Sequence, residues 1–399
     1  MKKIRIVGTG RTALGRLGRP AVSLAIEAFH AALRDARMTP QDIGGVVAVP
    51  SLSSPHFMQA HYFATCSGLM AANKKLVVRT IDTGGAGPIS AIGTASNIIR
   101  MEWAETVAII ASDAVLSLTS EEFLLRANNS VSGGGLPSPC IPNGYDRYAA
   151  WHMKQYGVTR DQFAMVPSLM SHNAVQHPES MCRTSVTLDE VLSSPPITPN
   201  INLLECARRA DGGVALILSS ERHYKRNFID KKQLGCHTPV VISVGEASGP
   251  LYPPEVITTD LFSCERAAKL AYSAANLGPK DIDFFGLYDC FPICFIRALE
   301  AVGVCSPGEG GQFVLDAYRR LQRKELSPNN FPINTHGGLL CHGAPWEVPA
   351  MYNVLEAVDQ LAGTAGARQI TPIPRRALVY GNGGIFSASS VAILGNGSY

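Results

Sequence analysis

The most restrictive feature of this 399-residue sequence is an internal repeat of one supersecondary unit. The end of a helix and a connector at 34–43 precede a β-branched run at 45–49. The same order recurs at 274–282, ahead of an apolar run at 284–287. Each copy is a helix, a Pro-x-Asp-Ile connector and a strand, the alternation that builds α/β folds. Such a connector is common by itself, so this repeat alone does not establish duplication.

Two further pairs of similar segments occur in the same order. The Thr-Gly-Gly turn at 83–85 precedes a helical pattern, and Thr-His-Gly-Gly at 335–338 precedes another at 347–361. A strand expected at 105–112 corresponds to one expected at 376–380. Three repeated features in the same order favour duplication over chance. We therefore predict two similar α/β halves packed together.

A long segment at 115–208 interrupts the first half. It contains a Ser-, Gly- and Pro-rich stretch at 128–148 and an expected helix at 145–156, and a buried strand follows at 211–218. Long insertions in α/β folds are usually lids or binding loops. The predicted domains are a first half at 1–114 plus 209–238, an inserted loop domain at 115–208 and a second half at 239–399.

The composition excludes several classes of protein. With 46% hydrophobic and 17% charged residues, the chain is globular and long enough for two core-bearing domains, and we expect no membrane span. The net charge is only +3, and there is no basic stripe with interleaved aromatic residues, so we expect no nucleic-acid partner. Ten cysteines without a tight framework spacing indicate reduced thiols inside a cell.

The N-terminal region is basic and has no acidic residue before Glu27. That is typical of a mitochondrial leader, yet the run at 4–7 also has the pattern of a first strand. There is no secretory signal, and the last residues are not a peroxisomal tripeptide. We therefore expect a mitochondrial or cytosolic protein, with neither location preferred.

A glycine-rich turn at the start of a helix is the first candidate site. A β-branched run leads into Gly84, Gly85 and Gly87, and a proline opens the helix. Such a turn directs free N–H groups and the positive end of a helix at one point, which suits a nucleophile or an oxyanion. Because glycine has no side chain, the turn itself supplies no nucleophile.

Several segments together resemble the thiolase superfamily, most closely the sterol-carrier-type thiolases and their thiolase-like relatives. These segments lie at 151–164, 171–174, 209–213, 288–291 and 334–345. The resemblance covers nearly the whole chain. It implies a duplicated thiolase fold of five layers, α/β/α/β/α, with a loop domain that binds coenzyme A, and it implies a homodimer.

The family's nucleophile is missing from this chain. In the family, a cysteine at the helix N-terminus forms a thiolate and carries the acyl group. When the family's last glycine is set on Gly87, Gly84 takes the place of that cysteine, and Gly85 takes it if the register shifts by one. The resemblance therefore implies that no acyl-enzyme forms and that an N–H donor remains at Gly84 or Gly85.

A second glycine turn, at 380–387, lacks the cysteine that degradative and biosynthetic thiolases have there. N–H groups around Gly383, with that of Gly84 or Gly85, would form an oxyanion hole, which requires backbone geometry and no particular side chain. From this stretch alone, a plain glycine turn is an equal alternative.

The segment Tyr288-Asp289-Cys290-Phe291 corresponds to His-Asp-Cys-Phe in the sterol-carrier-type thiolases. The family pattern implies that Cys290 is the acid/base for the proton on the α-carbon of the substrate. Tyr288 replaces an imidazole by a phenol with a pKa of about 10, which donates a hydrogen bond at neutral pH but seldom accepts a proton. We expect Asp289 to brace the loop. The alternative is that the tyrosine and the cysteine merely pack at the end of a strand.

The family's Gly-His-Pro loop is Gly-Ala-Pro here, with Ala344 in place of the imidazole that would bind the thioester oxygen. His342, two residues earlier, is the candidate replacement. Asn334 opens the same segment and is a further catalytic candidate. Glu347 stands where the family has a glycine and adds an ionisable group near the site.

We expect no metal and no permanently bound cofactor. His336, Cys341 and His342 lie close in the sequence but lack a fourth ligand. A CoA thioester is the expected substrate or ligand. His152 and Asn173 are the lead candidates for binding it, because they lie in the segments that best match the family.

Three functions are open at this point. The first is enolate chemistry on a CoA thioester of lipid metabolism, such as decarboxylation of malonyl-CoA, with oxyanion-hole donors for the electrons left by CO2 and Cys290 as the proton donor. The second is a retro-aldol lyase on a β-hydroxyacyl-CoA, which Tyr288 favours and which implies a partner subunit. The third is a non-catalytic acyl-CoA-binding protein, favoured by the number of lost catalytic groups.

Overall fold

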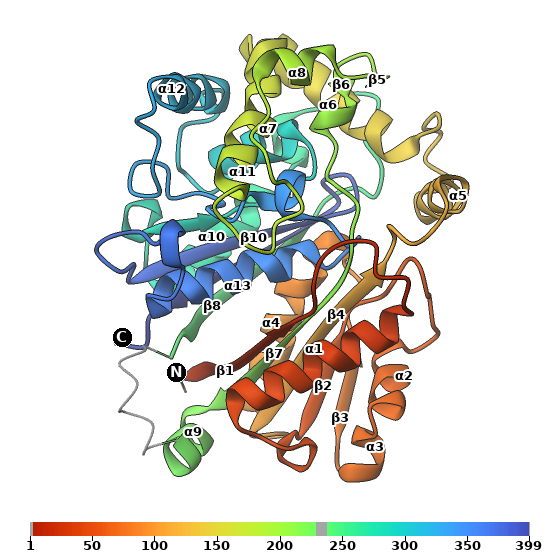
Figure 1. Ribbon diagram of the computed structural model, residues 1–399, viewed down its shortest axis with the longest axis vertical. Coiled ribbons are helices and arrows are strands. Elements are labelled where there is room, and N and C mark those ends of the chain that lie inside the picture. The colour runs from red at the N-terminus through yellow and green to blue at the C-terminus, as the bar shows by residue number, and fades with distance from the viewer. Residues whose placement is uncertain (1–2, 229–237, 399) are drawn as a thin grey trace.

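The computed structural model describes residues 3–228 and 238–398, and its strands form one long mixed sheet (Figure 1). The nine strands of this sheet lie in the order β3-β2-β4-β7-β1-β8-β11-β10-β9. Their bounds are β1 Ile4–Arg11, β2 Gly45–Ala48, β3 Val77–Thr80, β4 Thr106–Ala114, β7 Asp211–Ser220, β8 Val240–Ser248, β9 Phe284–Gly286, β10 Arg376–Gly383 and β11 Ala388–Gly395.

The sheet consists of two halves that meet at β1 and β8. From this junction outward, one half runs β1-β7-β4-β2-β3 and the other runs β8-β11-β10-β9. In each half the first three strands are antiparallel neighbours, and the outer strands pair in parallel. The halves are joined where Ile4 pairs with Val241 and Arg5 pairs with Val240. This symmetry confirms the predicted duplication.

Helices lie between and outside the two halves of the sheet, so that the molecule has five layers (Figure 1). α1 (Ala21–Ala36) packs on β1, β4 and β7, and α10 (Cys264–Ala275) packs on β8 and β11. α4 (Gly87–Arg100) and α13 (Pro349–Ala362) form the middle layer, and α4 contacts strands of both halves. The predicted α/β/α/β/α arrangement is therefore correct.

Both copies of the repeated connector are 3₁₀ turns, at Pro40–Asp42 and Pro279–Asp281. The carboxylate of Asp42 accepts a hydrogen bond of 2.7 Å from the backbone N–H three residues earlier. Asp281 accepts the equivalent bond at 2.8 Å. Each carboxylate closes the turn that leads from a helix into a strand. The sequence repeat thus reflects a repeated local structure.

Glycines in β1 and β8 let one helix approach each strand closely. A Cβ atom on Gly10 would lie 2.1 Å from the carbonyl oxygen of Ala28 in α1. A Cβ atom on Gly245 would lie 2.3 Å from the carbonyl oxygen of Ala267 in α10. A side chain at either position would push the outer helix away from the sheet. The close contact between strand and helix is therefore repeated in both halves, as duplication predicts.

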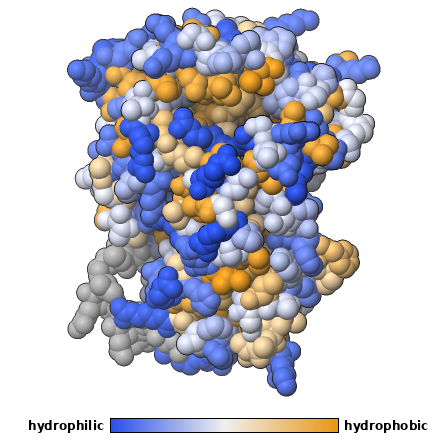
Figure 2. Space-filling view, turned by 45° about the vertical axis from the view of Figure 1, so that its right-hand side comes forward, coloured by the Kyte–Doolittle hydropathy of each residue, from blue (hydrophilic) through white to orange (hydrophobic). Residues whose placement is uncertain are grey.

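Between β4 and β7 the chain forms a helical segment in the upper part of Figure 1. Its elements are α5 (Ser120–Ser130), α6 (Cys140–Tyr156), α7 (Arg160–Ala174), α8 (Leu188–Ser193), β5 (Pro196–Thr198) and β6 (Ile201–Asn202). α7 packs on α11 (Pro292–Ala301) and α12 (Gly310–Gln322) of the second half. Figure 2 shows a band of hydrophobic surface across the upper part of the molecule. The domain limits expected from the sequence stay predictions.

The other helical elements in the described ranges are short. They are α2 (Gln59–Cys66), α3 (Leu69–Ala72), α9 (Glu221–Phe228), 3₁₀ turns at Gly84–Ala86, Leu203–Glu205, Thr259–Leu261 and Gly366–Arg368, and a π turn at Gly338–His342. Within residues 3–228 and 238–398, no helix combines the length and the apolar character that crossing a bilayer requires.

Candidate active site

The first glycine turn offers unpaired backbone donors. Gly84 has a φ of 57°, a conformation that favours glycine, and its turn continues directly into α4. The first hydrogen bond of the turn runs from the N–H of Ala86 to the carbonyl of Thr83 at 3.3 Å. The N–H groups of Gly84 and Gly85 have no acceptor among the described residues. Because buried N–H groups are almost always paired, the free donor of buried Gly85 indicates a ligand site.

The second glycine turn lies directly against the first. A Cβ atom on Gly84 would lie 2.8 Å from the backbone nitrogen of Gly384 and 3.0 Å from the Cα atom of Gly383. The Gly383 carbonyl accepts a hydrogen bond from the N–H of Ser387 at 3.0 Å. The N–H of Gly384, an exposed residue, has no acceptor in the part of the chain that the structure describes. The free donor of this turn is therefore that of Gly384, one residue beyond the predicted Gly383.

The phenol of Tyr288 occupies the space in which a side chain of residue 85 would lie. A Cβ atom on Gly85 would be 2.1 Å from the Oη atom of Tyr288 and 2.5 Å from the carbonyl oxygen of Asn382. A cysteine at position 85 and Tyr288 in this position exclude each other. Of the two registers that the sequence left open, position 85 is thus the one whose side chain would face Tyr288. Burial raises the pKa of Tyr288 well above its usual range, so the hydroxyl stays a donor at neutral pH.

Cys290 lies two residues after Tyr288 and contacts a second thiol. It is half-buried, and its Sγ atom is 3.3 Å from the Sγ atom of Cys294 in α11. Burial raises the pKa of the nearby Tyr145 hydroxyl well above its usual range, and Cys290, Cys294 and Tyr288 raise it further. The structure therefore brings Cys290 and Tyr288 into one cluster, as predicted from the motif that carries them.

Tyr145 is a site residue that the sequence did not identify. It comes from α6, is fully buried, and packs on Phe291 with 4.7 Å between the ring centroids. Its hydroxyl donates a hydrogen bond of 2.6 Å to the carbonyl of Gly384 and accepts one of 2.8 Å from Nδ2 of Asn382. Tyr145 thus fixes the second glycine turn from the inserted segment. No spacing in the sequence could have linked positions 145 and 384.

Asn334 and Asn173 hold the main chain around the site. Asn334 is fully buried with a φ of 46°, and its side-chain amide accepts from the N–H of Leu287 at 2.7 Å and donates to the carbonyl of Leu287 at 2.8 Å. Asn173 donates to the carbonyls of Ile333 and Asn334, each at 3.2 Å. Asn334 is engaged with backbone through both its amide oxygen and its amide nitrogen, and Asn173 through its amide nitrogen, so in this structure both side chains position the main chain around the site.

Asp289 braces the same loop, as expected. It is fully buried, and its Oδ1 atom accepts a hydrogen bond of 2.7 Å from the N–H of Leu339, within the π turn. A Cβ atom on Gly338 would lie 2.1 Å from Oδ2 of Asp289, so only glycine fits there. Burial raises the pKa of Asp289 to about 7. The carboxyl group ties the Tyr288 loop to the segment that carries His342.

Glu347 is a further ionisable group at the site. It is half-buried, and its Oε2 atom has no hydrogen-bond partner in the described chain. Burial, with the charges of Asp82 and Asp113, raises the pKa of Glu347 to about 8. The charge of Glu347 contributes to the raised pKa of Tyr288, so the two groups are close enough to interact. The sequence identified this residue only as a departure from the family pattern.

His342 does not join the Tyr288 loop. Its buried ring packs against His177, His336 and Tyr352, with centroid separations of 4.5, 5.1 and 5.2 Å. Burial and the neighbouring histidines lower the pKa of His342 well below its usual range. The expectation that His342 replaces the imidazole lost at Ala344 is not met in this structure, because the ring belongs to a separate cluster of histidines.

His152 has a structural role that the sequence did not predict. It is fully buried, and its Nε2 atom lies 3.1 Å from Oε1 of Glu300 in α11. Arg297 donates to the other oxygen of Glu300 at 2.6 Å. A CoA ester cannot reach His152 in this arrangement. The residue joins the inserted segment to the second half, and the prediction that it binds CoA is corrected accordingly.

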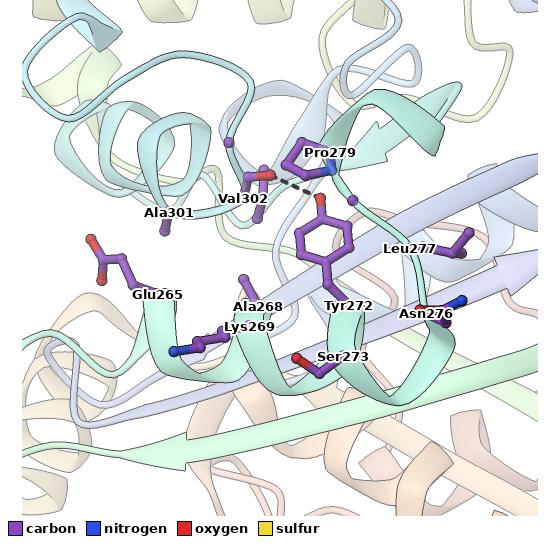
Figure 3. Close-up of a pocket in the computed structure, with 12 residues that line it drawn as sticks. Glu265, Ala268, Lys269, Tyr272, Ser273, Asn276, Leu277, Pro279, Ala301 and Val302 are labelled. Carbon is purple, nitrogen blue, oxygen red and sulfur yellow. Dashed lines mark hydrogen bonds between the residues drawn. The ribbon is translucent and has the colours of Figure 1, made fainter.

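A cavity elsewhere on the molecule is unrelated to this site. It lies between α10 and the end of α11 and has a volume of about 460 Å³ (Figure 3). Glu265, Lys269 and Tyr272 line it, and the Tyr272 hydroxyl donates to the carbonyl of Val302 at 2.8 Å. No candidate site residue lines this cavity. No group of side chains in the described ranges has the composition of a metal site.

The histidine cluster makes the stability of the fold depend on pH. Burial lowers the pKa of His177 from 6.5 to about 3 and that of His336 from 6.5 to about 4, so both are neutral in the folded state. The unfolded chain binds protons at these residues below pH 6.5. Stability is therefore complete above pH 6.5 and is lost as the pH falls towards 4, by about 2 kcal/mol per histidine at pH 5.

Urea denaturation between pH 7.5 and pH 5 measures this effect. His177→Gln should make the pH dependence of the unfolding free energy shallower than in the wild type. His30→Gln is the matched control, because His30 is exposed, and it should leave the dependence unchanged. Equal slopes for all three proteins would contradict the assignment.

Comparisons with known proteins give one family. The family model "Thiolase C-terminal domain-like" matches residues 255–396. The chain is 27% identical to an acetyl-CoA acetyltransferase of Methanothermobacter thermautotrophicus, over 93% of this chain and 94% of that protein. It is 29% identical to sterol carrier protein 2 of Bos taurus, over 59% of this chain and 42% of that protein.

Solved structures agree with this family. The structure named Ltp2-ChsH2(DUF35) aldolase superposes with a TM-score of 0.81 and 24% identity, and covers 99% of this chain and 98% of its own. A monomeric SCP2-thiolase-like protein type 1 of Mycobacterium smegmatis superposes with a TM-score of 0.72 and 20% identity, over 98% and 77%. These two show the fold, and the sequence comparisons show that the chain is similar to proteins of the thiolase superfamily, among them the sterol-carrier-type relatives, with residues 255–396 matching a thiolase C-terminal domain.

Proposed function

We propose that this protein stabilises the enolate of a CoA thioester without forming an acyl-enzyme, and that decarboxylation of malonyl-CoA is its reaction. The observation that carries the proposal is the meeting of two glycine turns with free N–H groups at Gly84, Gly85 and Gly384. A thioester oxygen bound there would accept hydrogen bonds from the backbone. Gly84 and Gly85, the two positions that can correspond to the family's cysteine, have no side chain that could accept an acyl group.

The proposed reaction needs a sink for electrons and a source of one proton. When the C–C bond to the carboxylate breaks, CO2 leaves and the electron pair moves onto the thioester oxygen, where the N–H groups stabilise the charge. Tyr288 stays protonated, and its hydroxyl donates a hydrogen bond to the thioester oxygen. Cys290 then delivers its proton to the α-carbon, and the product is acetyl-CoA.

Retro-aldol cleavage of a β-hydroxyacyl-CoA is the second candidate. It would release the same type of enolate, so the same N–H groups would serve it. The specific observation in its favour is the Tyr288 phenol in the space above Gly85, with the unpaired carboxyl oxygen of Glu347 nearby. The aldolase that superposes on this chain supports this candidate by similarity of fold alone. A requirement for a partner subunit would accompany it.

Malonyl-CoA tests the main proposal directly. Purified protein should convert malonyl-CoA to acetyl-CoA and CO2 faster than buffer, and Cys290→Ser should lower kcat by about 100-fold or more, because the proton donor is lost. Saturable binding without any acetyl-CoA would instead indicate the non-catalytic acyl-CoA-binding protein. Cleavage of a β-hydroxyacyl-CoA that needs an added partner and disappears in Tyr288→Phe would indicate the lyase.

A single methyl group tests the role of the first glycine turn. Gly85→Ala places a Cβ atom 2.1 Å from Oη of Tyr288, so the phenol must move and the turnover of malonyl-CoA should fall by about 100-fold. Gly278→Ala is the matched control, since its nearest atom would be a carboxyl oxygen of Asp281 at 3.9 Å. Full activity in a folded Gly85→Ala protein would contradict the proposed site.

We also propose that the protein is a homodimer formed through β3. This strand ends the sheet, so its outer edge presents backbone N–H and C=O groups with which a second chain can pair. A depression beside it is lined by apolar residues that include Met70, Val77 and Trp103, and Trp103 is 55% exposed. An edge of this kind, with an exposed tryptophan, supports pairing with a second copy.

A charge on this surface tests the dimer. The wild type should have the mass of two chains in light scattering at micromolar concentration. Trp103→Glu should shift the protein towards one chain, because a carboxylate would have to be buried in the interface. Ile373→Glu, a change at another exposed apolar residue, should not shift it. A wild type with the mass of one chain at all concentrations would exclude the proposal.

A further inference from the structure

Two thiols meet at the active-site loop, although the proposed reaction uses one of them. The Sγ atoms of Cys290 and Cys294 are 3.3 Å apart, and both thiols are free. A disulfide has an S–S length of about 2.05 Å, so bond formation needs a movement of roughly 1.2 Å. Contact between two thiols at this distance is a condition for reversible oxidation at an active-site cysteine.

The two thiols are placed unequally with respect to solvent. Cys290 is half-buried and precedes α11, in a loop whose next residue, Phe291, has extended backbone (φ −142°). Cys294 is the third residue of α11 and is completely buried. An oxidant that enters the site reaches Cys290 first. Cys294 is then held behind it by the helix, in the position of a resolving thiol.

Cys294 is not needed for the proposed proton transfer. Its sulfur contacts Cys290, and its remaining environment is the buried core around Tyr145. Burial raises the pKa of Cys294 well above its usual range, so its thiol is neutral in the reduced protein. The contact of 3.3 Å places the Cys294 sulfur where it can attack an oxidised Cys290 once it gives up its proton.

We propose that Cys290 and Cys294 form a reversible disulfide when the protein meets a peroxide, and that this modification switches the site off. The Cys290 sulfur attacks the O–O bond, is oxidised to a sulfenic acid and releases one water. The Cys294 sulfur then attacks the sulfenic sulfur, the S–O bond breaks, and the thiol proton leaves with the hydroxyl group as a second water. In total, two thiols lose two electrons and two protons, and one peroxide is reduced to two waters.

The effect on turnover rests on the function proposed above, because a Cys290 sulfur bonded to Cys294 carries no proton for the α-carbon. Formation of the bond itself does not depend on that function. Both cysteines lie between Lys280 and Arg297, with no basic residue between them, so one tryptic peptide contains the whole site. Its mass reports the bond whether or not any substrate is turned over.

The test is hydrogen peroxide treatment of the folded wild-type protein, alkylation of remaining thiols with iodoacetamide, and mass spectrometry of peptide 281–297. We expect this peptide to become two hydrogens lighter than its reduced form and to carry no alkyl group, and dithiothreitol should restore two alkylatable thiols. Decarboxylation of malonyl-CoA should be lost and regained in parallel. A wild-type peptide that keeps both thiols, or that goes directly to sulfinic acid, would overturn the proposal.

Two variants complete the experiment. Cys294→Ser should keep its basal turnover but lose it irreversibly with peroxide, because no resolving thiol remains and Cys290 oxidises further. Cys66→Ser removes an exposed thiol elsewhere and should respond like the wild type. Reversible protection in Cys294→Ser would overturn the proposal. If the disulfide forms but malonyl-CoA is never decarboxylated, the redox site stands and the proposed reaction fails.

Discussion

The site depends on a backbone contact between two glycine turns, where neither turn has a side chain in the way. The Gly84 turn begins α4 in the first half, and the Gly383–Gly384 turn ends β10 in the second half, and a single Cβ atom at Gly84 would lie 2.8 Å from the opposite backbone. Such an approach is possible only between glycines. It leaves N–H groups of both halves unpaired in one place. The duplication therefore matters for function because it brings one donor turn from each half to the same point.

The loss of the family's cysteine is coupled to the tyrosine. The Tyr288 phenol fills the volume that a side chain at position 85 would need, so Tyr288 in this position requires a glycine at 85. A thiolate at this turn would serve acyl transfer, whereas a protonated phenol with free N–H groups beside it can only stabilise negative charge on oxygen. The replacement thus changes the chemistry that the site can perform and not merely its rate. This arrangement of donors is what supports the proposed enolate chemistry.

The sequence predicted local features well and long-range environments poorly. The duplicated halves follow from repeated connectors and glycine turns, and the connectors are closed by neighbouring residues such as Asp42 and Asp281. The five layers are predicted from the family resemblance alone. The environment of a side chain depends on segments far apart in the chain. Tyr145 reaches the Gly384 turn across 239 positions, and His152 pairs with Glu300 across 148. His342 has its expected place in the motif, but contacts with His177 and Tyr352 take its ring into another cluster.

Residues that match the family motif have other roles in this fold than residues that depart from it. Asn334 and Asp289 match it, and their side chains are bound to the backbone of Leu287 and Leu339, so they hold loops in place. Gly85, Tyr288 and Glu347 depart from it: the Tyr288 phenol lies against Gly85, whose N–H group has no acceptor among the described residues, and the charge of Glu347 acts on Tyr288. The matching residues thus hold the loops of the site, while the departures lie where the proposed chemistry would take place.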